Sequence, residues 1–146
     1  MEQRFDVSKL IPAGYKAMYG VHTYVQGCGL DLGLLELVRL RISQLNGCAF
    51  CVAMHIPLAR KHGLSEHQIN LVATWKESPV FSARERAALA WAEAVTDLSS
   101  QEVPDAVYDA LCQHFNATEI ANLTLCVAEI NSWNRLMVAS RTPPQL

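Results

Sequence analysis

Two cysteines and a histidine in the segment NGCAFCVAMH have the spacing of a reactive dithiol. Cys48 and Cys51 are three residues apart, and His55 follows four residues after Cys51. In a helix starting at about Cys48, the three side chains fall within about 60° of one another and can share one pocket. A helix N-terminus favours the thiolate, the form of cysteine that attacks peroxides and disulfides. The spacing predicts dithiol redox chemistry, with His55 able to accept or relay the proton of Cys51.

The same residues have other interpretations. Free cysteines are commonly buried, so Cys48 and Cys51 could be packing residues, and His55 a core histidine unrelated to them. The pair could also be half of a zinc site, but such a site needs further ligands and the sequence has no second pair. The other cysteines are isolated: Cys28, Cys112 and Cys126. We therefore favour dithiol chemistry and expect no metal and no other cofactor.

A second segment, a predicted helix reaching Asn46 with Asp31 as its N-cap, carries a narrow polar stripe. Apolar residues cover nearly every side of this helix, which is typical of a buried helix. The polar residues fall within one arc of about 80°: Glu36, Arg39, Ser43 and Asn46. A carboxylate buried there needs partners. The stripe is either a buried Glu36–Arg39 pair at i,i+3 or a face exposed to solvent.

Residues typical of helix starts and ends occur along the whole chain and predict helices throughout. Proline at helix starts, glycine at helix ends and several capping boxes mark the boundaries, whereas no β-branched run alternates and no hairpin turn joins two such runs. The helices are expected at about 12–26, 31–46, 48–62, 66–76, 83–98, 104–115 and 117–140. We therefore predict an all-α fold, a single-domain bundle of about seven helices over residues 1–146.

Composition and charge exclude several classes of function. The chain has 146 residues, of which 51% are hydrophobic and 18% charged, as in one globular domain. A net charge of −2 gives no basic footprint for nucleic acid. The N-terminal residues do not read as a signal peptide, and no stretch reaches the ~18 uncharged apolar residues of a membrane helix. We expect a cytoplasmic protein with neither nucleic acid nor membrane as a partner.

The stretch ELVRLRISQLNGCAFCVAMH resembles the alkylhydroperoxidase D-like branch of the carboxymuconolactone decarboxylase family. The family pattern is a glutamate, a cysteine twelve residues later, a second cysteine at +3 and a histidine at +4. All four positions match: Glu36, Cys48, Cys51 and His55. Residues 82–98 and 130–135 are also similar to family blocks, so the resemblance covers about 10–140. It implies an all-helical fold and homo-oligomers, commonly trimers or hexamers.

The resemblance also implies thiol peroxidase or disulfide reductase chemistry without haem or flavin. Cys51 would attack the peroxide and become a sulfenic acid, and Cys48 would condense with it to a disulfide. His55 would relay the proton, and Glu36 would be the base that orients His55. The implied partners are a peroxide substrate and a thiol or lipoylated-protein reductant. The chain departs from the best-studied peroxidases at Phe50, where they can carry a second histidine.

Two classes of function follow. The leading hypothesis is a dithiol peroxidase, alkyl hydroperoxide reductase-like, with a disulfide reductase using the same dithiol as its variant. The rival is a non-catalytic helical oligomerisation or binding module whose cysteines only pack. A disulfide between Cys48 and Cys51 after mild oxidation distinguishes the two, because packing thiols need not react with each other.

Overall fold

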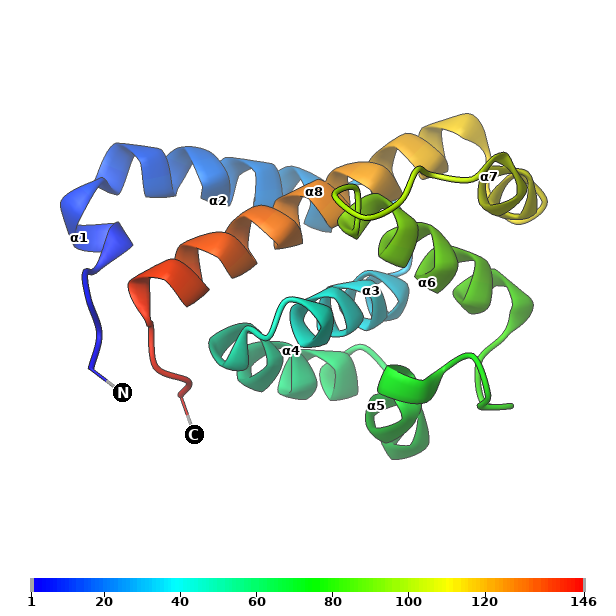
Figure 1. Cartoon of the computed structure of the whole chain (residues 1–146), viewed down its shortest axis with the longest axis horizontal. Helices are drawn as coiled ribbons and strands as arrows, with labels where there is room; N and C mark the ends of the chain where they lie inside the picture. The colour runs from blue at the N-terminus through cyan, green and yellow to red at the C-terminus, as the bar shows by residue number, and fades with distance from the viewer. Residues whose placement is uncertain (1, 146) are drawn as a thin grey trace.

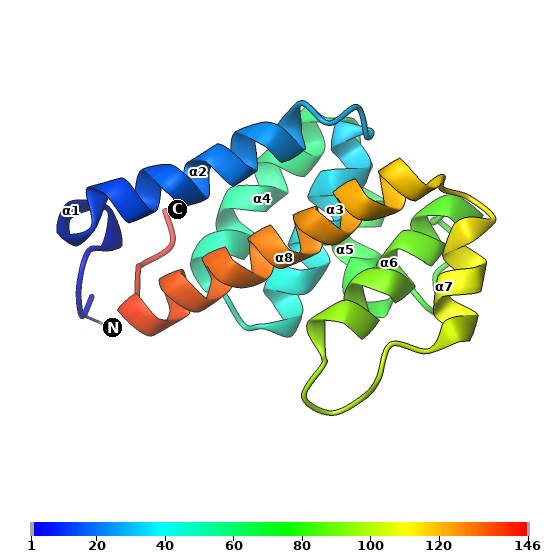
Figure 2. The same ribbon diagram turned by 90° about the horizontal axis from the view of Figure 1, so that it is seen from above.

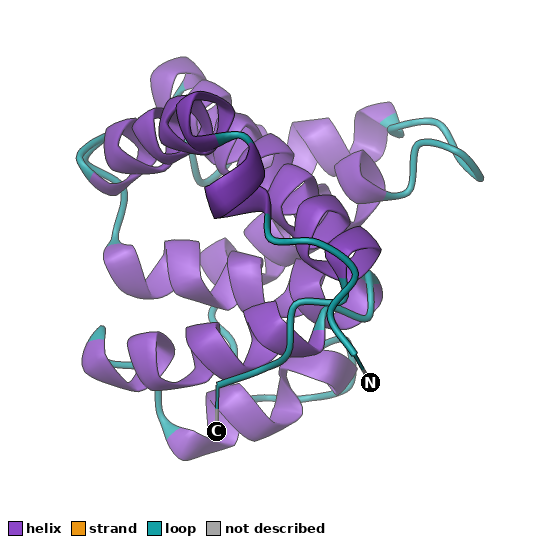
Figure 3. Ribbon diagram, turned by 90° about the vertical axis from the view of Figure 1, so that its left-hand side faces the viewer, coloured by secondary structure: helices purple, strands orange, loops and turns teal. Residues whose placement is uncertain are grey.

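The computed structural model describes residues 2–145, and every element within that range is helical (Figures 1 and 3). The elements are α1 (Val7–Leu10), α2 (Pro12–Gln26), α3 (Leu32–Leu45), α4 (Ala49–Lys61), α5 (Glu66–Leu71), the short 3-10 helix η1 (Val72–Thr74), α6 (Ala83–Thr96), α7 (Asp105–Cys112) and α8 (Ala117–Ser140). The all-α prediction is confirmed. None of these helices is both long and apolar enough to cross a bilayer.

Helix α3 is the central element of the fold. It packs against α4, α6, α8 and η1, and Figure 2 shows α8 crossing over it. Every residue from 33 to 40 is buried, which agrees with the apolar pattern that covers nearly all sides of this helix. A polar side chain in this stretch of α3 therefore has to find its partners inside the protein.

The turn between α3 and α4 places the dithiol. Gly47 adopts a φ of +67°, a conformation that L side chains rarely adopt. Its N–H donates to the carbonyl of Gln44, and the N–H of Cys48 donates to the carbonyl of Ser43. This is the Schellman motif that closes a helix C-terminus. Because Cys48 is the next residue, α4 starts directly beside the end of α3.

The structure differs most from the predicted boundaries in two places, and the helices predicted over 83–98 and 104–115 end two and three residues early, at Thr96 and Cys112. Asp6 accepts hydrogen bonds from the backbone of Ser8 and Lys9 and so starts the additional helix α1. The helix predicted over 66–76 ends at Leu71 and tightens into η1. In a 3-10 helix residues i and i+3 lie on one side, which directs both Val72 and Trp75 into the core.

Segments from near the two ends of the chain meet beside the dithiol. The N–H of Arg4 donates to the carbonyl of Ser140 at 2.8 Å. Val7 and Met137, one from each end, form a small buried cluster with Cys48 and Cys51. Residues from both end segments therefore help to bury the dithiol.

Candidate active site

The two cysteines form a disulfide at the N-terminus of α4. Cys48 is the N-cap residue, and its sulfur accepts a hydrogen bond from the N–H of Cys51 at 3.2 Å. The Cα atoms of Cys48 and Cys51 are 5.3 Å apart. Both residues are buried, with exposed fractions of 2% and 1%. The predicted helix start is confirmed, and the chain can hold the two sulfurs in a bond.

Glu36 and His55 meet across the contact between α3 and α4. The Nδ1 of His55 lies 2.7 Å from Oε2 of Glu36, and both side chains are buried. Because an ionised carboxylate only accepts hydrogen bonds, Nδ1 carries the hydrogen, and in the neutral form of this tautomer Nε2 has a free lone pair. That Nε2 is buried and has no hydrogen-bond partner among the described residues. His55 is thereby oriented to accept a proton at Nε2.

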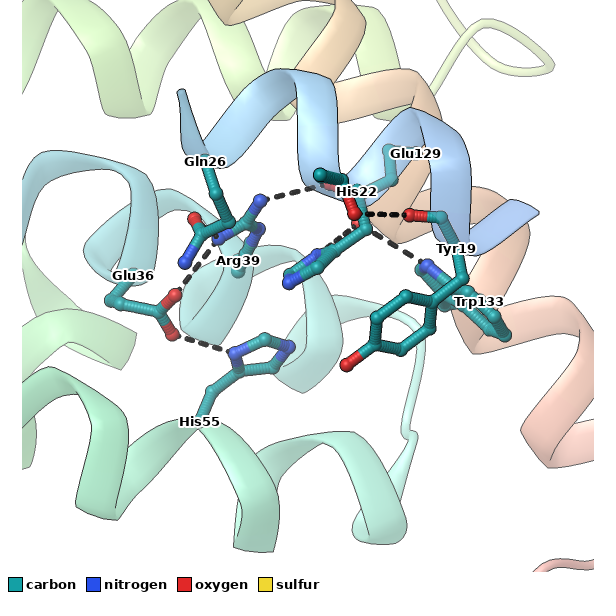
Figure 4. A network of polar contacts seen from close by, with 9 residues as sticks. Tyr19, His22, Gln26, Glu36, Arg39, His55, Glu129 and Trp133 are labelled. Carbon is teal, nitrogen blue, oxygen red and sulfur yellow. Dashed lines mark hydrogen bonds and ion pairs between the residues drawn. The ribbon is translucent and has the colours of Figure 1, made fainter. Parts of the chain in front are cut away.

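Arg39 joins this pair to a second carboxylate (Figure 4). Its Nη1 donates to Oε1 of Glu36 at 2.8 Å, and its Nη2 donates to Oε2 of Glu129 at 3.0 Å. Nη1 also donates to Oε1 of Gln26 at 2.8 Å. The Arg39 side chain has no exposed surface. Of the two interpretations of the polar stripe, the buried pair is correct at Glu36 and Arg39.

Glu129 holds a second histidine, His22, which the sequence analysis did not identify. Oε1 of Glu129 lies 2.7 Å from Nδ1 of His22 and accepts a hydrogen bond from the indole N–H of Trp133 at 3.2 Å. A signal for Glu129 was available, since it is the only charged residue between Glu119 and Arg135 in an apolar helix. No comparable pattern marks His22, which α2 brings to the site from 107 residues away.

Both carboxylates remain ionised in this environment. Burial alone would raise the pKa of Glu36, but the hydrogen bond from His55 and the charge and hydrogen bond of Arg39 outweigh it, and the pKa is lowered. Burial also opposes ionisation of Glu129, whose pKa is lowered by His22 and Arg39. Each carboxylate can therefore accept hydrogen bonds from its histidine and from the shared guanidinium.

A cavity of about 170 Å³ lies against these groups. Its volume is more than ten times the ~10–15 Å³ that one water molecule needs. Apolar and aromatic side chains form most of its wall, and a few polar groups reach it. The lining residues are Tyr15, Tyr19, His22, Phe50, Cys51, Met54, His55, Leu58, Glu129, Trp133 and Met137. Cys51 lines this cavity, whereas Cys48 is not among its lining residues.

The C-terminal part of the polar stripe, Ser43 and Asn46, has a different role. Asn46 donates to the side-chain oxygens of Asn131 and Asn134, and Asn134 donates to Ser43 at 3.0 Å. These residues do not line the cavity. Their hydrogen bonds fasten α3 to α8 and provide no reactive group.

Within residues 2–145, no three His, Cys, Asp or Glu side chains are placed together to bind a metal ion. The sulfurs of Cys48 and Cys51 are bonded to each other. The free cysteines, Cys28, Cys112 and Cys126, form no further pair. The donor set expected of a zinc site is therefore not assembled around the dithiol.

Residues 12–94 match the model of the carboxymuconolactone decarboxylase family, which covers more than half of the chain. The chain belongs to the carboxymuconolactone decarboxylase family. The matched region contains the dithiol, His55, Glu36, Arg39 and His22, whereas Glu129 lies beyond it. The resemblance of residues 36–55 to this family is thus confirmed over a longer stretch.

Relatives in this family include an uncharacterised protein and a structure of unknown function. The chain is 37% identical over 139 residues to the uncharacterised protein YdfG of Bacillus subtilis, covering 95% of both chains. A crystal structure from Agrobacterium tumefaciens, of unknown function and suggested to be an antioxidant defence protein AhpD, matches with a TM-score of 0.97 and 41% identity over 99% of both chains. The AhpD-like fold of the chain follows from this similarity.

A more distant neighbour shares the fold at low sequence identity. The debrominase Bmp8 matches with a TM-score of 0.83 at 18% identity, over 92% of this chain and 72% of that protein. At that identity the match is evidence for the fold alone. The chemistry of the present chain has to be argued from its own site.

Proposed function

We propose that this protein is a dithiol peroxidase that reduces organic hydroperoxides. The observation that carries the proposal is that Cys51 lines the same cavity as His55, whose Nδ1 is fixed by Glu36. His55 lies four residues after Cys51 on the same face of α4, so its free Nε2 can take the thiol proton. The thiolate is further favoured by the N-terminus of α4.

The disulfide supports the roles assigned to the two cysteines. In the reduced protein, the Cys51 thiolate attacks the hydroperoxide and becomes a sulfenic acid, and the organic product is an alcohol. The Cys48 thiol then condenses with the sulfenic acid, releasing water and forming the Cys48–Cys51 disulfide. Cys51 is the nucleophile because it lines the cavity, and Cys48 resolves because its sulfur can bond to that of Cys51. A thiol or lipoylated-protein reductant restores the dithiol.

The wall of the cavity favours an organic substrate over hydrogen peroxide. Four aromatic rings, two methionines and a leucine contribute to the lining. Binding an alkyl or aryl group there removes apolar surface from water, which stabilises the complex by roughly 25 cal/mol per Å². Hydrogen peroxide has no apolar group to bury, so we expect the higher kcat/KM for a hydroperoxide such as cumene hydroperoxide.

The function is tested by single-turnover reduction of cumene hydroperoxide by the pre-reduced protein. We expect the wild type to consume one equivalent and to form the Cys48–Cys51 disulfide. Both cysteines lie in the tryptic peptide 42–60, so the disulfide is detected by mass spectrometry as loss of two hydrogens from that peptide and as its resistance to alkylation. Cys51→Ser should lose the reaction, and Cys112→Ser, which changes an exposed free cysteine, should retain it. Full turnover by Cys51→Ser would contradict the proposal.

The same assay distinguishes the alternatives. If the reduced protein is oxidised by a small disulfide or by lipoamide but not by cumene hydroperoxide, the protein is a disulfide reductase that uses the same dithiol. If none of these oxidants forms the Cys48–Cys51 bond, the protein is a non-catalytic helical module.

A further inference from the structure

Two imidazoles from different helices line the same cavity, and each is held by its own buried carboxylate. His55 on α4 is bonded through Nδ1 to Glu36, and His22 on α2 is bonded through Nδ1 to Glu129, both at 2.7 Å. Figure 4 shows the two rings between their carboxylates, with Arg39 linking the two pairs. In both histidines the Nδ1 contact leaves Nε2 as the atom that can exchange a proton.

The charges of this cluster leave room for one extra proton. Two buried carboxylates face one guanidinium, so the cluster carries one uncompensated negative charge when both imidazoles are neutral. The nearby Cys126 adds no charge, because burial raises the pKa of its thiol to about 12. Net charge is costly in a buried site. A single proton added to one of the two imidazoles would therefore balance the charge of the cluster.

The proposed peroxidase reaction requires one group that accepts a proton and one that donates it. The thiol of Cys51 must lose a proton before attack, and the oxygen that leaves the hydroperoxide must gain one. Phe50 lines the cavity beside Cys51 but carries no proton to donate. His22 is the more accessible imidazole, with 24% of its side chain exposed against 3% for His55, so it can regain protons from solvent.

We propose that His22 is a second catalytic residue, the general acid that protonates the leaving oxygen while His55 accepts the proton of Cys51. This inference rests on the proposed peroxidase function. The sulfur of Cys51 bonds to the terminal oxygen of the hydroperoxide, the O–O bond breaks, and its electron pair goes to the alkoxide oxygen. Sulfur is oxidised to the sulfenic acid, and the hydroperoxide is reduced to the alcohol.

The protons balance in the same step. One enters the cluster at His55 and one leaves it at His22, so the cluster keeps its total charge during the attack. Afterwards His55 releases its proton and His22 regains one from solvent. Glu129 is a positioning residue in this scheme, since it holds Nδ1 of His22 and is itself fixed by Arg39 and Trp133.

The acidity of the leaving group provides the test. An alkoxide leaves poorly without a proton, whereas the carboxylate that leaves from a peroxy acid needs none. In His22→Gln, the single-turnover rate with tert-butyl hydroperoxide should fall by about 100-fold, within the range of general acid catalysis. The rate with peroxybenzoic acid should stay within about threefold. His67→Gln, which changes an exposed histidine on α5, is the matched control and should react like the wild type.

A second measurement separates acid catalysis from damage to the site. Iodoacetamide alkylates Cys51 with iodide as the leaving group, which needs no proton, so its rate reports only the thiolate. We expect His22→Gln to keep the wild-type alkylation rate and His55→Gln to lose it. Equal losses with tert-butyl hydroperoxide and peroxybenzoic acid, or no loss with either, would overturn the role of His22. Failure of the wild type with both oxidants would instead overturn the peroxidase function itself.

Discussion

The two acid–histidine pairs of the site share their geometry but differ in origin and exposure. Glu36 and His55 are 19 residues apart on adjoining helices, and both are buried. His22 and Glu129 are 107 residues apart, and His22 is partly exposed. Arg39 bonds to both carboxylates. The difference indicates two separate roles. The buried pair, Glu36 and His55, accepts the proton of the Cys51 thiol, and the partly exposed pair, Glu129 and His22, exchanges protons with solvent.

Removing Arg39 should produce the largest effect on stability, because both pairs depend on it. Arg39→Met leaves two buried carboxylates without their shared cation, and breaking a buried ion pair in this way costs about 3–5 kcal/mol. Urea unfolding measures the free energy of unfolding. Arg60→Met, at the exposed Arg60–Glu66 pair, should leave that free energy essentially unchanged. Equal effects in the two variants would contradict the account.

A second substitution shows which carboxylate depends more on Arg39. Among residues 2–145, the partners of Glu36 are Arg39 and His55, whereas Glu129 also accepts from Trp133. Adding Glu36→Gln to Arg39→Met should therefore recover more of the lost free energy of unfolding than adding Glu129→Gln. The reverse order would show that Glu129 depends more on the guanidinium of Arg39 than Glu36 does.

The carboxylates should differ in their effect on catalysis. Glu36→Gln removes the charge that fixes His55, and we expect the rate of Cys51 alkylation and of peroxide reduction to fall by about 10²–10⁴-fold, the usual contribution of a general base. Glu129→Gln should leave alkylation intact and slow only the reaction with alkyl hydroperoxides. Stopped-flow kinetics with iodoacetamide and tert-butyl hydroperoxide measures both rates. Parallel losses in the two variants would remove the distinction between the pairs.

The sequence was informative where the chemistry is local. Cys48, Cys51 and His55 follow one another within a helix, so their spacing alone places them on one face. Glu36 was marked as a polar residue in an apolar helix, although only the structure shows that its stripe is buried there. The all-helical fold followed from caps, prolines and glycines along the chain.

The second pair could not be predicted in the same way. His22 and Glu129 are 107 residues apart, and their contact depends on how α2 packs against α8. The periodicity of hydrophobic residues within a helix does not predict which helices pack together. Glu129 could have been suspected by the argument applied to Glu36, but its partner His22 could not. Helix α1 was missed for a local reason, since it is only four residues long and depends on its Asp6 cap.

Acid should weaken the fold through both pairs. The pKa values of Glu36 and Glu129 lie below the ordinary 4.5 in the folded protein, so the unfolded chain binds protons more readily. Their contribution to stability is complete above about pH 5 and is lost as pH falls through the unfolded and then the folded pKa. Urea midpoints between pH 3 and 7 should fall with acid, and less steeply in Glu36→Gln and Glu129→Gln. An unchanged slope in either variant would exclude that carboxylate from the effect.

The smallest effect is expected at Cys126, which lies beside Arg39 but outside both pairs. Burial raises the pKa of its thiol to about 12 despite the charge of Arg39, so at pH 8 the folded protein should expose Cys112 to a thiol reagent and protect Cys126. Cys126→Ala should keep alkylation of Cys51 within about twofold, because it removes no charge from the cluster. Rapid labelling of Cys126 in the folded protein would show that Arg39 stabilises a thiolate there.

The sulfur of Cys51 is proposed to attack the peroxide, and trapping the oxidised form of Cys51 tests this most directly. In Cys48→Ser no resolving thiol is present, so one equivalent of cumene hydroperoxide should leave a sulfenic acid on Cys51 that dimedone labels and peptide mass spectrometry locates. Cys51→Ser treated in the same way should give no label on Cys48. A label on Cys48 in Cys51→Ser, or none on Cys51 in Cys48→Ser, would contradict the account.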